Sequence, residues 1–424
     1  MTGFKISLLF TFYLAIACRC LAQYEAPLYT SYTTKAAREK MRSRMINYTI
    51  NRNLSLELND STEEKWEEAF GAIELMLYKS PISDKKIYEA FGKIENRSIE
   101  FQRSLIEVAY SVYPLQFNNE VDQLLTNTND PKLFAMCAEY LLADKADFEF
   151  KENLLGLTNK KFGSISATDP ILYMLKSHLA EINGHKRSIP AETIRTIFSG
   201  SFLHGKIVMY SIQRKNRDYP GMVVVRNASG NFVRDSLGQI ITVPQLARSL
   251  SNMPGYISNG NTPQGIFLMY GFGVSMSSFI GPSVNVQMGM PFETSIKKFL
   301  GDSSIYDSAW TIDYYKTLIP KKLQNYGPLY YSYYSGEAGR SEIIAHGTTV
   351  DPNFYLNQSY YPLTPSQGCL CTREIWDGKR IESDQQQLVN ALLKAGGANG
   401  YCVVIELNDK ESPVMLKDIL PYLR

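Results

Sequence analysis

Two residues in the last quarter of this 424-residue chain are suited to nucleophilic chemistry, namely His346 and Cys369. A thiol with a reference pKa of about 8.5 is mostly protonated at neutral pH, and a neighbouring imidazole can remove its proton. The thiolate attacks carbonyl carbon atoms, so the pair predicts acyl transfer through a thioester. Gly368 leaves room for a substrate carbonyl, and backbone N–H groups around Cys369 could stabilise the oxyanion. A buried, inert cysteine in a turn is the alternative interpretation.

Histidine is scarce, since the chain contains only His178, His185, His204 and His346. The first three lie in a helical stripe, in a basic loop and at the start of a strand, so we expect structural or solvated positions for them. His346 instead ends an apolar run and precedes a loop rich in Tyr and Pro that reaches Cys369. A strand-end histidine and a glycine-flanked cysteine on such a loop can meet in space.

Short β-type segments are expected to position this pair. These segments, separated by Gly, Asn, Ser and Pro, are 206–213, 221–227, 239–243, 265–270 and 341–346. The turn residues between them favour a mostly antiparallel, β-rich arrangement. Ser383 and Gln386 form a capping box for a helix that Gly396 ends, and a closing strand is expected over 401–407.

The N-terminal half has a different period. Between about residues 60 and 200, apolar residues recur with the spacing of amphipathic helices. Asp130 followed by Pro131 is typical of a helix start. Short helices with short links predict stacked helical hairpins, which loosely resemble a HEAT-type solenoid. No signature residues repeat at a fixed period, so a plain helical bundle is the alternative interpretation.

Length and composition restrict the class of protein. A chain of 424 residues predicts two or three domains, and 44% hydrophobic with 20% charged residues is ordinary for a globular protein. Lys and Arg number 44 and Asp and Glu number 42, so the net charge of +2 leaves no positive excess for a nucleic-acid backbone. We therefore expect no nucleic-acid partner.

The N-terminus resembles a secretory signal peptide. Residues 1–22 combine Lys5, an apolar run and a small-residue cleavage site. The run is shorter than the roughly 20 residues needed to cross a bilayer, so no transmembrane segment is predicted. The mature protein is expected in the periplasm or cell envelope. Residues 15–18 also resemble a weak lipobox, so lipid anchoring at Cys18 is the less favoured alternative.

The cysteines that remain after this signal are Cys137, Cys369, Cys371 and Cys402. Four scattered thiols lack the paired spacings of a zinc site or a disulfide scaffold. The sequence therefore predicts neither a metal site nor a cofactor. Cys371 is not expected to form a disulfide with Cys369, because residues two apart in an extended chain are at the upper limit for a bridge.

The order of these features resembles that of the L,D-transpeptidases, which cross-link peptidoglycan. Their signature runs from a strand-end His-Gly through a loop to Ser/Thr-His-Gly-Cys, followed by a helix and a closing strand. The corresponding segments here are 346–348 and 366–369, followed by the capped helix from Ser383. Upstream, residues 261–267 are similar to the family's Thr-Pro-x-Gly-x-Phe stretch. The resemblance covers residues 203–408.

The resemblance completes the predicted domain organisation. We expect an α+β protein with a signal peptide at 1–22, an all-α domain of helical hairpins at 23–200, a β-rich, L,D-transpeptidase-like catalytic domain at 201–408 and a C-terminal tail at 409–424. The helical domain is expected to bind an unknown partner in the envelope.

The resemblance also implies a role for each residue of the site. Cys369 would be the nucleophile, His346 the base, the backbone around Gly368 and Cys369 the oxyanion hole, and Gln367 an orienting group. The residues expected to contact the substrate are Ser366, Thr348, Gly347, Arg373 and Arg340.

Two positions depart from the family pattern. The family's second histidine is Gln367 here, and glutamine cannot titrate or carry a positive charge. The family's Arg or Asn two residues after the nucleophile is replaced by Cys371. Arg373 or Arg340 could supply the missing cation for a substrate carboxylate, because a guanidinium fork suits that group. A solvated surface position is the alternative for each arginine.

The implied reaction is attack of Cys369 on an L,D-peptide bond of a peptidoglycan stem peptide, with release of D-alanine. An acceptor amine then resolves the thioester. Transfer to water would make the protein an L,D-carboxypeptidase, and both reactions use the same residues. The alternative from a different class is a catalytically weak protein that binds peptidoglycan. Tyrosines within 326–334 either wall a cleft for the stem peptide or pack as alternating residues of a strand.

Overall fold

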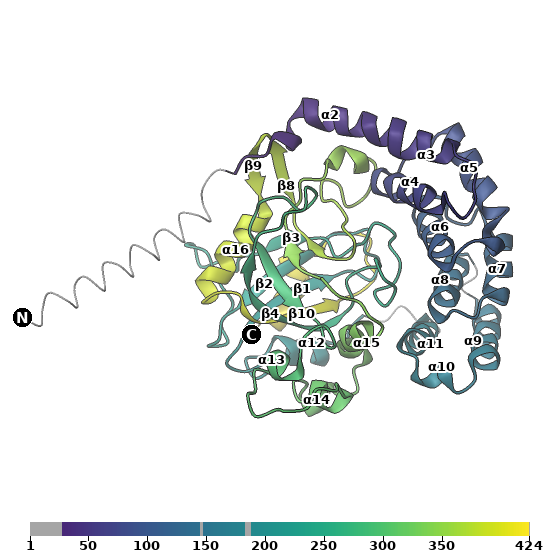
Figure 1. Cartoon of the computed structure of the whole chain (residues 1–424). Coiled ribbons are helices and arrows are strands. Elements are labelled where there is room, and N and C mark those ends of the chain that lie inside the picture. Colours follow the sequence, from purple (N-terminus) through teal and green to yellow (C-terminus); the bar gives the residue numbers. More distant parts are fainter. Residues whose placement is uncertain (1–27, 145–146, 183–187, 424) are drawn as a thin grey trace, which may run out of the picture.

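A computed structural model describes residues 28–144, 147–182 and 188–423. The predicted signal peptide at 1–22, with Cys18, lies outside these residues, and so does His185. The chain is a mixed α/β protein in which N-terminal helices curve around one side of a large, nearly closed sheet (Figure 1). No helix in the described part is long and apolar enough to cross a membrane.

The N-terminal helices form an arc over residues 31–182, called the helical arc below. Its main helices are α2 (Lys35–Arg44), η2 (Met45–Arg52), α4 (Glu63–Met76), α5 (Pro81–Phe91), α6 (Ile99–Val112), α7 (Asn118–Asn127), α8 (Pro131–Leu142), α9 (Phe148–Phe162), α10 (Ile165–Thr168) and α11 (Pro170–Ile182). Helices α4, α6, α8 and α11 pack against one another in that order on the inner side of the arc (Figure 1). Such stacking buries a continuous core, as in solenoids. The HEAT-type assignment stays a prediction.

The predicted helix start at Asp130 is confirmed. The Asp130 carboxylate accepts a hydrogen bond of 2.7 Å from the Leu133 N–H, and Pro131 occupies the first position of α8. From Leu133 to Leu142 every side chain of α8 is buried. This helix therefore forms the centre of the core of the arc.

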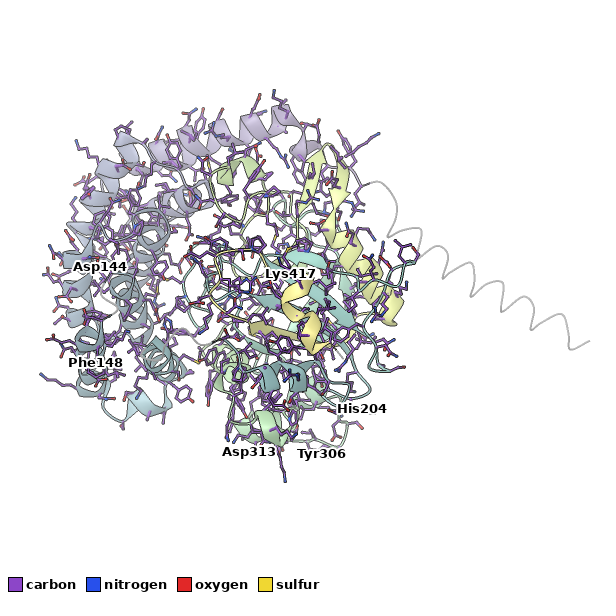
Figure 2. All side chains as sticks on the ribbon, turned by 180° about the vertical axis from the view of Figure 1, so that it is seen from behind. Asp144, Phe148, His204, Tyr306, Asp313 and Lys417 are labelled. Atoms are coloured by element: carbon purple, nitrogen blue, oxygen red, sulfur yellow. The ribbon has the colours of Figure 1, made fainter. Side chains whose placement is uncertain are left out.

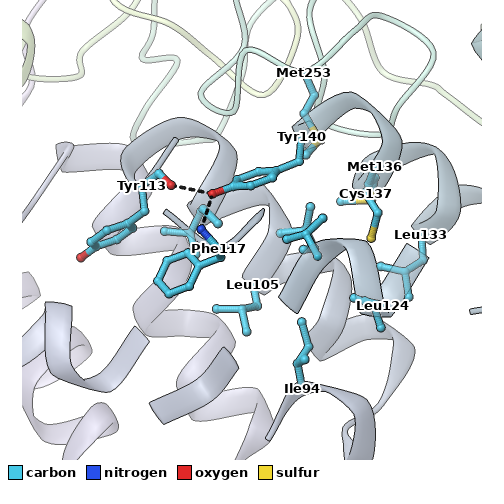
Figure 3. Close-up of a cluster of buried hydrophobic side chains, with 14 of the residues drawn as sticks. Ile94, Leu105, Tyr113, Phe117, Leu124, Leu133, Met136, Cys137, Tyr140 and Met253 are labelled. Carbon is cyan, nitrogen blue, oxygen red and sulfur yellow. Dashed lines mark hydrogen bonds between the residues drawn. The ribbon is translucent and has the colours of Figure 1, made fainter. Parts of the chain in front are cut away.

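The core of the arc contains side chains from both halves of the chain. The Tyr140 hydroxyl donates to the Tyr113 carbonyl oxygen at 2.8 Å and accepts from the Phe117 N–H at 3.1 Å, which satisfies polar groups in an apolar interior (Figure 3). Met253 and Tyr256, which come from the second half, are buried in the same cluster. The arc and the sheet therefore share part of one core.

The second half is built on an eight-stranded sheet in the order β3-β2-β1-β10-β4-β5-β6-β7. Its strands are β1 (Ile207–Gln213), β2 (Gly221–Arg226), β3 (Val243–Gln245), β4 (Gly265–Gly273), β5 (Asn285–Gly289), β6 (Ala345–His346), β7 (Leu370–Cys371) and β10 (Asn399–Glu406). Most pairs are antiparallel, as predicted, but β1 with β10 and β6 with β7 are parallel. Leu246, directly after β3, exchanges two backbone hydrogen bonds of 2.8 Å with Cys371 of β7. This seam nearly closes the sheet.

Further elements complete the second half. They are α12 (Ala191–Phe198), α13 (Ile296–Leu300), α14 (Ile312–Lys316), α16 (Asp384–Ala395), α17 (Leu416–Ile419) and the hairpin β8 (Glu374–Asp377) with β9 (Lys379–Ser383). Half of the predicted capping box of α16 is confirmed, since the Gln386 N–H donates to the Ser383 hydroxyl oxygen at 2.9 Å. The Gln386 carboxamide bonds Arg380 and Asn390 instead of the Ser383 N–H. Gly396 ends this helix in the left-handed conformation, with φ 113°.

Two predicted boundaries differ from the structure. Ile197 and Phe198 of α12 pack in the core of the sheet, so the change from arc to sheet comes before α12 rather than at residue 200. The segment 409–424 was expected as a tail, but Val414 and Ile419 are buried against the same core. Apolar side chains in both segments explain these differences, because burial in this core removes them from water.

Two predicted strands also differ. Only Ala345 and His346 of the run 341–346 join the sheet, because Glu342 has a φ of 61° and the chain bends there. Of the tyrosines of 326–334, Tyr326 directly precedes η5 (Gly327–Tyr330), and the others lie in η5 and α15 (Tyr331–Glu337), not on a strand. Pro328 stands in the first turn of η5, where its fixed φ favours a helical start.

Candidate active site

The candidate nucleophile, Cys369, ends a tight turn at the beginning of β7. The Gly368 N–H donates to the Ser366 hydroxyl oxygen at 3.2 Å, and that hydroxyl donates to the Cys369 carbonyl oxygen at 3.0 Å. The turn is tied to the segment before β4, since the Thr262 hydroxyl donates to the Gly368 carbonyl oxygen at 2.8 Å. Ser366 thus shapes the turn, whereas the sequence predicted that it contacts the substrate.

Gly368 is required by the shape of this turn. Its φ is 105°, a conformation that residues with a Cβ rarely adopt. A Cβ at this position would also overlap the guanidinium of Arg340 and the Gly260 carbonyl oxygen. Gly368 was predicted to leave room for a substrate carbonyl, but Arg340 and Gly260 occupy the space on one side of it.

His346 ends β6, and Cys369 directly precedes the adjacent strand β7. β6 pairs with β7 in parallel, with Ala345 opposite Leu370 and His346 opposite Cys371. Ala345 and Leu370 point into the core, so His346 and Cys371, which alternate with them, point to the other face. Strand spacing and rise place the Cα atoms of His346 and Cys369 about 8 Å apart, which these two side chains can bridge.

No hydrogen bond among the described residues joins His346 to Cys369. The Nδ1 atom of His346 instead lies 2.5 Å from the Gly347 carbonyl oxygen. A carbonyl can only accept, so this contact assigns the proton to Nδ1 and leaves Nε2 as the basic nitrogen. Burial lowers the pKa of His346, and its imidazole is therefore neutral at neutral pH. Catalytic hydrogen bonds often form only when substrate is bound.

Arg340 is a buried cation whose charge acts on the Cys369 thiol. Its Nη1 atom donates to the carbonyl oxygens of Gly255 and Asn261 at 2.5 and 2.8 Å, and its Nη2 atom donates to that of Gly260 at 2.9 Å. No ion pair among the described residues involves Arg340. Burial lowers the pKa of Arg340 to about 10, so the group stays charged at neutral pH. Its charge favours the thiolate form of Cys369.

The thiol of Cys369 has a mixed environment. The side chain is half-buried, and its Sγ atom lies 3.4 Å from the Glu342 carbonyl oxygen. Burial raises the pKa of Cys369, while a hydrogen bond from the Ile344 backbone and the charge of Arg340 lower it. The carboxylates of Glu342 and Glu293 add a smaller increase of this pKa. A base is therefore needed to form the thiolate at neutral pH.

Gly347 and Thr348 do not lie at the surface of the site. Both are buried, and a Cβ on Gly347 would overlap the carboxylate of Glu374. Glu374 is itself held by the hydroxyl groups of Ser283 and Ser383, each at 2.6 Å. The Thr348 hydroxyl accepts from the Val350 N–H at 3.1 Å. These residues support the strand that ends in His346, whereas the sequence predicted that Gly347 and Thr348 contact the substrate.

Arg373 and Gln367 point away from the buried part of the site. Arg373 forms ion pairs with Glu382 at 2.8 Å and Asp384 at 3.3 Å, so its charge is already compensated. Gln367 is exposed and forms no hydrogen bond within the described residues. It is thus accessible to a substrate, whereas Arg373 is not a spare cation.

Cys371 lies in the seam of the sheet and is buried. Its Sγ atom is 3.9 Å from the Thr364 hydroxyl oxygen, and burial raises the pKa of Cys371 to about 12. Cys137, Cys369, Cys371 and Cys402 are all free thiols. Cys371 therefore forms no disulfide here and is protonated at neutral pH.

Among the described residues, neither His178 nor His204 forms a hydrogen bond with the Cys369 thiol. His178 on α11 contacts Glu139 of α8 through Nδ1 at 2.7 Å. His204 is exposed and lies at the periphery of the molecule, on the side away from the helical arc (Figure 2). Within the described residues there is no group of three or more His, Cys, Asp or Glu side chains that could hold a metal ion.

Two contributors to the site were not assigned such a role from the sequence. Thr262 belongs to the segment 261–267, which marked the family resemblance, and the structure places it against the nucleophile turn. Glu342 follows Arg340 and contributes a backbone carbonyl to the thiol. Gly368 in the segment 366–369 signalled a turn, but no local pattern indicates that Thr262 and Glu342 are its partners. No protein-family model, curated protein or solved structure matches this chain.

Proposed function

We propose that the protein is a cysteine-dependent acyltransferase that acts on peptidoglycan stem peptides in the manner of the L,D-transpeptidases. The observation that carries this proposal is the placement of Cys369. Its half-buried thiol stands on a turn that Thr262 holds by a hydrogen bond and Arg340 packs against, directly before β7, which pairs with the strand that ends in His346. A fixed thiol beside a neutral imidazole is the arrangement that thiolate catalysis needs.

The first half of the reaction uses these groups in sequence. Nε2 of His346 accepts the proton of the Cys369 thiol, and the thiolate attacks the carbonyl carbon of the L,D-peptide bond. The oxyanion that forms accepts a hydrogen bond from the Cys369 N–H, which has no partner among the described residues. The Gly368 N–H is already bound to Ser366, so the oxyanion hole has one donor fewer than the sequence predicted. The proton returns from Nε2 to the leaving amine, D-alanine departs, and a thioester remains.

The second half releases the acyl group. The amine of another stem peptide attacks the thioester, and Nε2 of His346 takes the proton that this amine loses and returns it to the thiolate. Attack by water in place of the amine gives L,D-carboxypeptidase activity with the same protein groups. The two outcomes differ only in which nucleophile reaches the thioester. A stem peptide would meet this protein in the periplasm or cell envelope, as the sequence at 1–22 indicates.

A second candidate function is binding of peptidoglycan with little catalysis. Gln367 favours it, because an exposed carboxamide can hold a peptide but cannot assist proton transfer. The helical arc would then serve to bind a partner in the envelope. The two candidates differ in whether a covalent acyl-enzyme forms.

The test is incubation of the purified protein with muropeptides, followed by mass analysis of products and of the protein. We expect release of D-alanine and an acyl adduct on the protein, both abolished in Cys369→Ala. Cys402→Ala is the matched control, because Cys402 is a buried thiol of the sheet core and should change neither result. Binding of muropeptides without release of D-alanine would favour the second candidate.

A further inference from the structure

Gln385 is a fully buried glutamine in the first turn of α16. Its Nε2 atom donates to the carbonyl oxygens of Val284 at 2.9 Å and Ala345 at 3.1 Å, and its Oε1 atom accepts from the Thr372 hydroxyl at 2.8 Å. A carboxamide has two N–H donors and one oxygen, so all of its polar atoms are engaged. The side chain therefore joins α16 to three other segments of the chain.

Two of these contacts converge on the backbone of His346. Ala345 precedes His346 in β6, so Gln385 holds the carbonyl group on the N-terminal side of that residue. The Thr372 N–H donates to the carbonyl oxygen of His346 itself at 2.9 Å, and the Thr372 hydroxyl lies 3.2 Å from the same oxygen. The carbonyl groups on both sides of the His346 Cα atom are thus bonded. These bonds fix the two peptide planes from which the imidazole projects.

The direction of the imidazole decides which of its nitrogens is basic. Nδ1 of His346 donates to the Gly347 carbonyl oxygen, which leaves Nε2 to accept the proton of a thiol. Glycine is the residue with the fewest backbone restrictions, so Gly347 alone does not hold its carbonyl group in place. The bonds of Gln385 and Thr372 to the preceding backbone supply that restraint.

The surroundings of this network make it rigid. Gln385 and Thr372 are both inaccessible to solvent, so water does not replace a contact that is lost. Leu388 and Leu392 anchor α16 in the core of the sheet, so its first turn does not follow a movement of β6. A side chain on such an element positions a neighbouring group more precisely than one on a loop.

We propose that Gln385 is a positioning residue for His346, and that its carboxamide, together with Thr372, sets the direction of the imidazole and its distance from the Cys369 thiol. The inference rests on the proposed function in one respect, namely that His346 acts as the base for Cys369. Among the described residues, Gln385 forms no hydrogen bond with the thiol, so it acts through the backbone of β6. An ionised glutamate in its place would offer no donor to the two carbonyl oxygens.

The test is a double-mutant cycle on the alkylation rate of Cys369 in the full-length protein. Gln385→Met keeps the length of the side chain and removes its donors and its oxygen. It should slow alkylation at neutral pH roughly tenfold to a hundredfold when His346 is present, because the base is then misplaced. In the His346→Ala background it should have no effect. An equal loss in both backgrounds, or no loss in either, would overturn the inference.

Gln102→Met is the matched control. Gln102 is a buried glutamine of α6, and its Nε2 atom donates to the carbonyl oxygens of Ile94 at 2.9 Å and Arg97 at 3.1 Å. Gln102→Met therefore removes the same kind of contacts from the helical arc, and it should lower the thermal midpoint while alkylation keeps its wild-type rate and pH profile. Slower alkylation in Gln102→Met would attribute the loss to general destabilisation and contradict the inference.

A milder pair of variants serves if Gln385→Met does not fold. Thr372→Val keeps the shape of the side chain but removes the hydroxyl that bonds Gln385. It should slow alkylation roughly threefold to tenfold, as expected for one hydrogen bond. Thr372→Ser keeps the hydroxyl and should restore the wild-type rate. Equal rates for Thr372→Val and Thr372→Ser would show that this bond does not position His346.

NMR spectra of the ring nitrogens of His346 separate this inference from the proposed function. In the wild type we expect a single tautomer with the proton on Nδ1, and in Gln385→Met the shifts of the two nitrogens should move toward each other as both tautomers become populated. If His346→Ala leaves alkylation unchanged, the proposed base is refuted, but altered shifts in Gln385→Met would keep the positioning role. Unchanged shifts, with alkylation that depends on His346, would keep the base and refute the role of Gln385.

Discussion

Cys369 and Cys371 are two residues apart in the chain, but the turn that holds one and the seam that holds the other give the two thiols different surroundings. The turn 366–369 leaves Cys369 half-buried, at the end of a strand, with Arg340 beside its thiol. The seam between β7 and Leu246 holds the backbone of Cys371 by two hydrogen bonds and buries its thiol among Thr364 and Thr348. Burial is the main cause that raises the pKa of Cys371 to about 12, and burial also raises the pKa of Cys369, but the charge of Arg340 opposes the increase only at Cys369. We therefore expect the reactivity of each thiol to depend on its position in the sheet and not on its nearness in sequence to the other.

The largest effect that would test this difference is expected for His346→Ala. Removal of the base should slow acylation of Cys369 roughly a hundredfold to ten-thousandfold. Burial lowers the pKa of His346 from 6.5, so the wild-type rate should fall only as pH drops below that value and protonates Nε2. Alkylation rates of Cys369 measured against pH check both statements.

The control for this variant is His204→Ala, because His204 is exposed and lies at the periphery. It should retain the wild-type pH profile. Identical alkylation profiles for wild type and His346→Ala would show that the imidazole does not act on Cys369.

A second large effect is expected for Gly368→Ala. The methyl group would overlap Arg340 and the Gly260 carbonyl oxygen, and the φ of 105° would add strain of about 1–3 kcal/mol. We expect a lower thermal midpoint and loss of acylation. Gly339→Ala separates backbone strain from steric overlap. The φ of Gly339 is 88°, but no atom lies within 4 Å of the added Cβ, so this variant introduces strain alone. A Gly368→Ala protein with full acylation would contradict the described turn.

An intermediate effect is expected for Arg340→Lys. Lysine keeps the charge but cannot span the three carbonyl oxygens of the segment 255–261 as the guanidinium does. Loss of one charge-assisted hydrogen bond of about 1.5 kcal/mol corresponds to a roughly tenfold slower reaction. The pH at which the alkylation rate of Cys369 reaches half of its maximum should also rise. Arg373→Lys, whose charge is compensated by Glu382 and Asp384, should leave both quantities unchanged.

The smallest effect on activity is expected for Cys371→Ser. A hydroxyl in this buried seam should lower the free energy of unfolding by about 1–3 kcal/mol while turnover stays normal. Chemical denaturation and muropeptide turnover measure the two quantities. A Cys371→Ser protein with normal stability but no turnover would contradict this, because Cys371 would then be the cysteine that turnover needs.

Local signals predicted parts of the fold correctly. Asp130 with Pro131 marked the start of α8, and Ser383 with Gly396 marked both ends of α16, because caps depend on neighbouring residues. The boundary predicted at residue 200 differs from the packing, because α12 already lies in the core of the sheet. The apolar face of α12 gives no indication of which core receives it, since that depends on contacts remote in sequence.

The candidate site was predictable only in its central pair. The strand end at His346 and the glycine turn before Cys369 are visible in the sequence, and in the structure they belong to the adjacent strands β6 and β7 and the turn that leads into β7. The buried position of Arg340 depends on carbonyl groups about 80 residues earlier in the chain. The supporting positions of Ser366, Gly347 and Thr348 likewise depend on packing that residue types do not reveal.

The most direct test of the central claim is the site of covalent labelling in the folded protein. Wild type, Cys369→Ser and Cys371→Ser would each be treated at neutral pH with a β-lactam or an alkylating probe and weighed intact. If Cys369 is the nucleophile, wild type and Cys371→Ser carry a single adduct, and Cys369→Ser carries none. A retained adduct in Cys369→Ser together with its loss in Cys371→Ser would contradict the account.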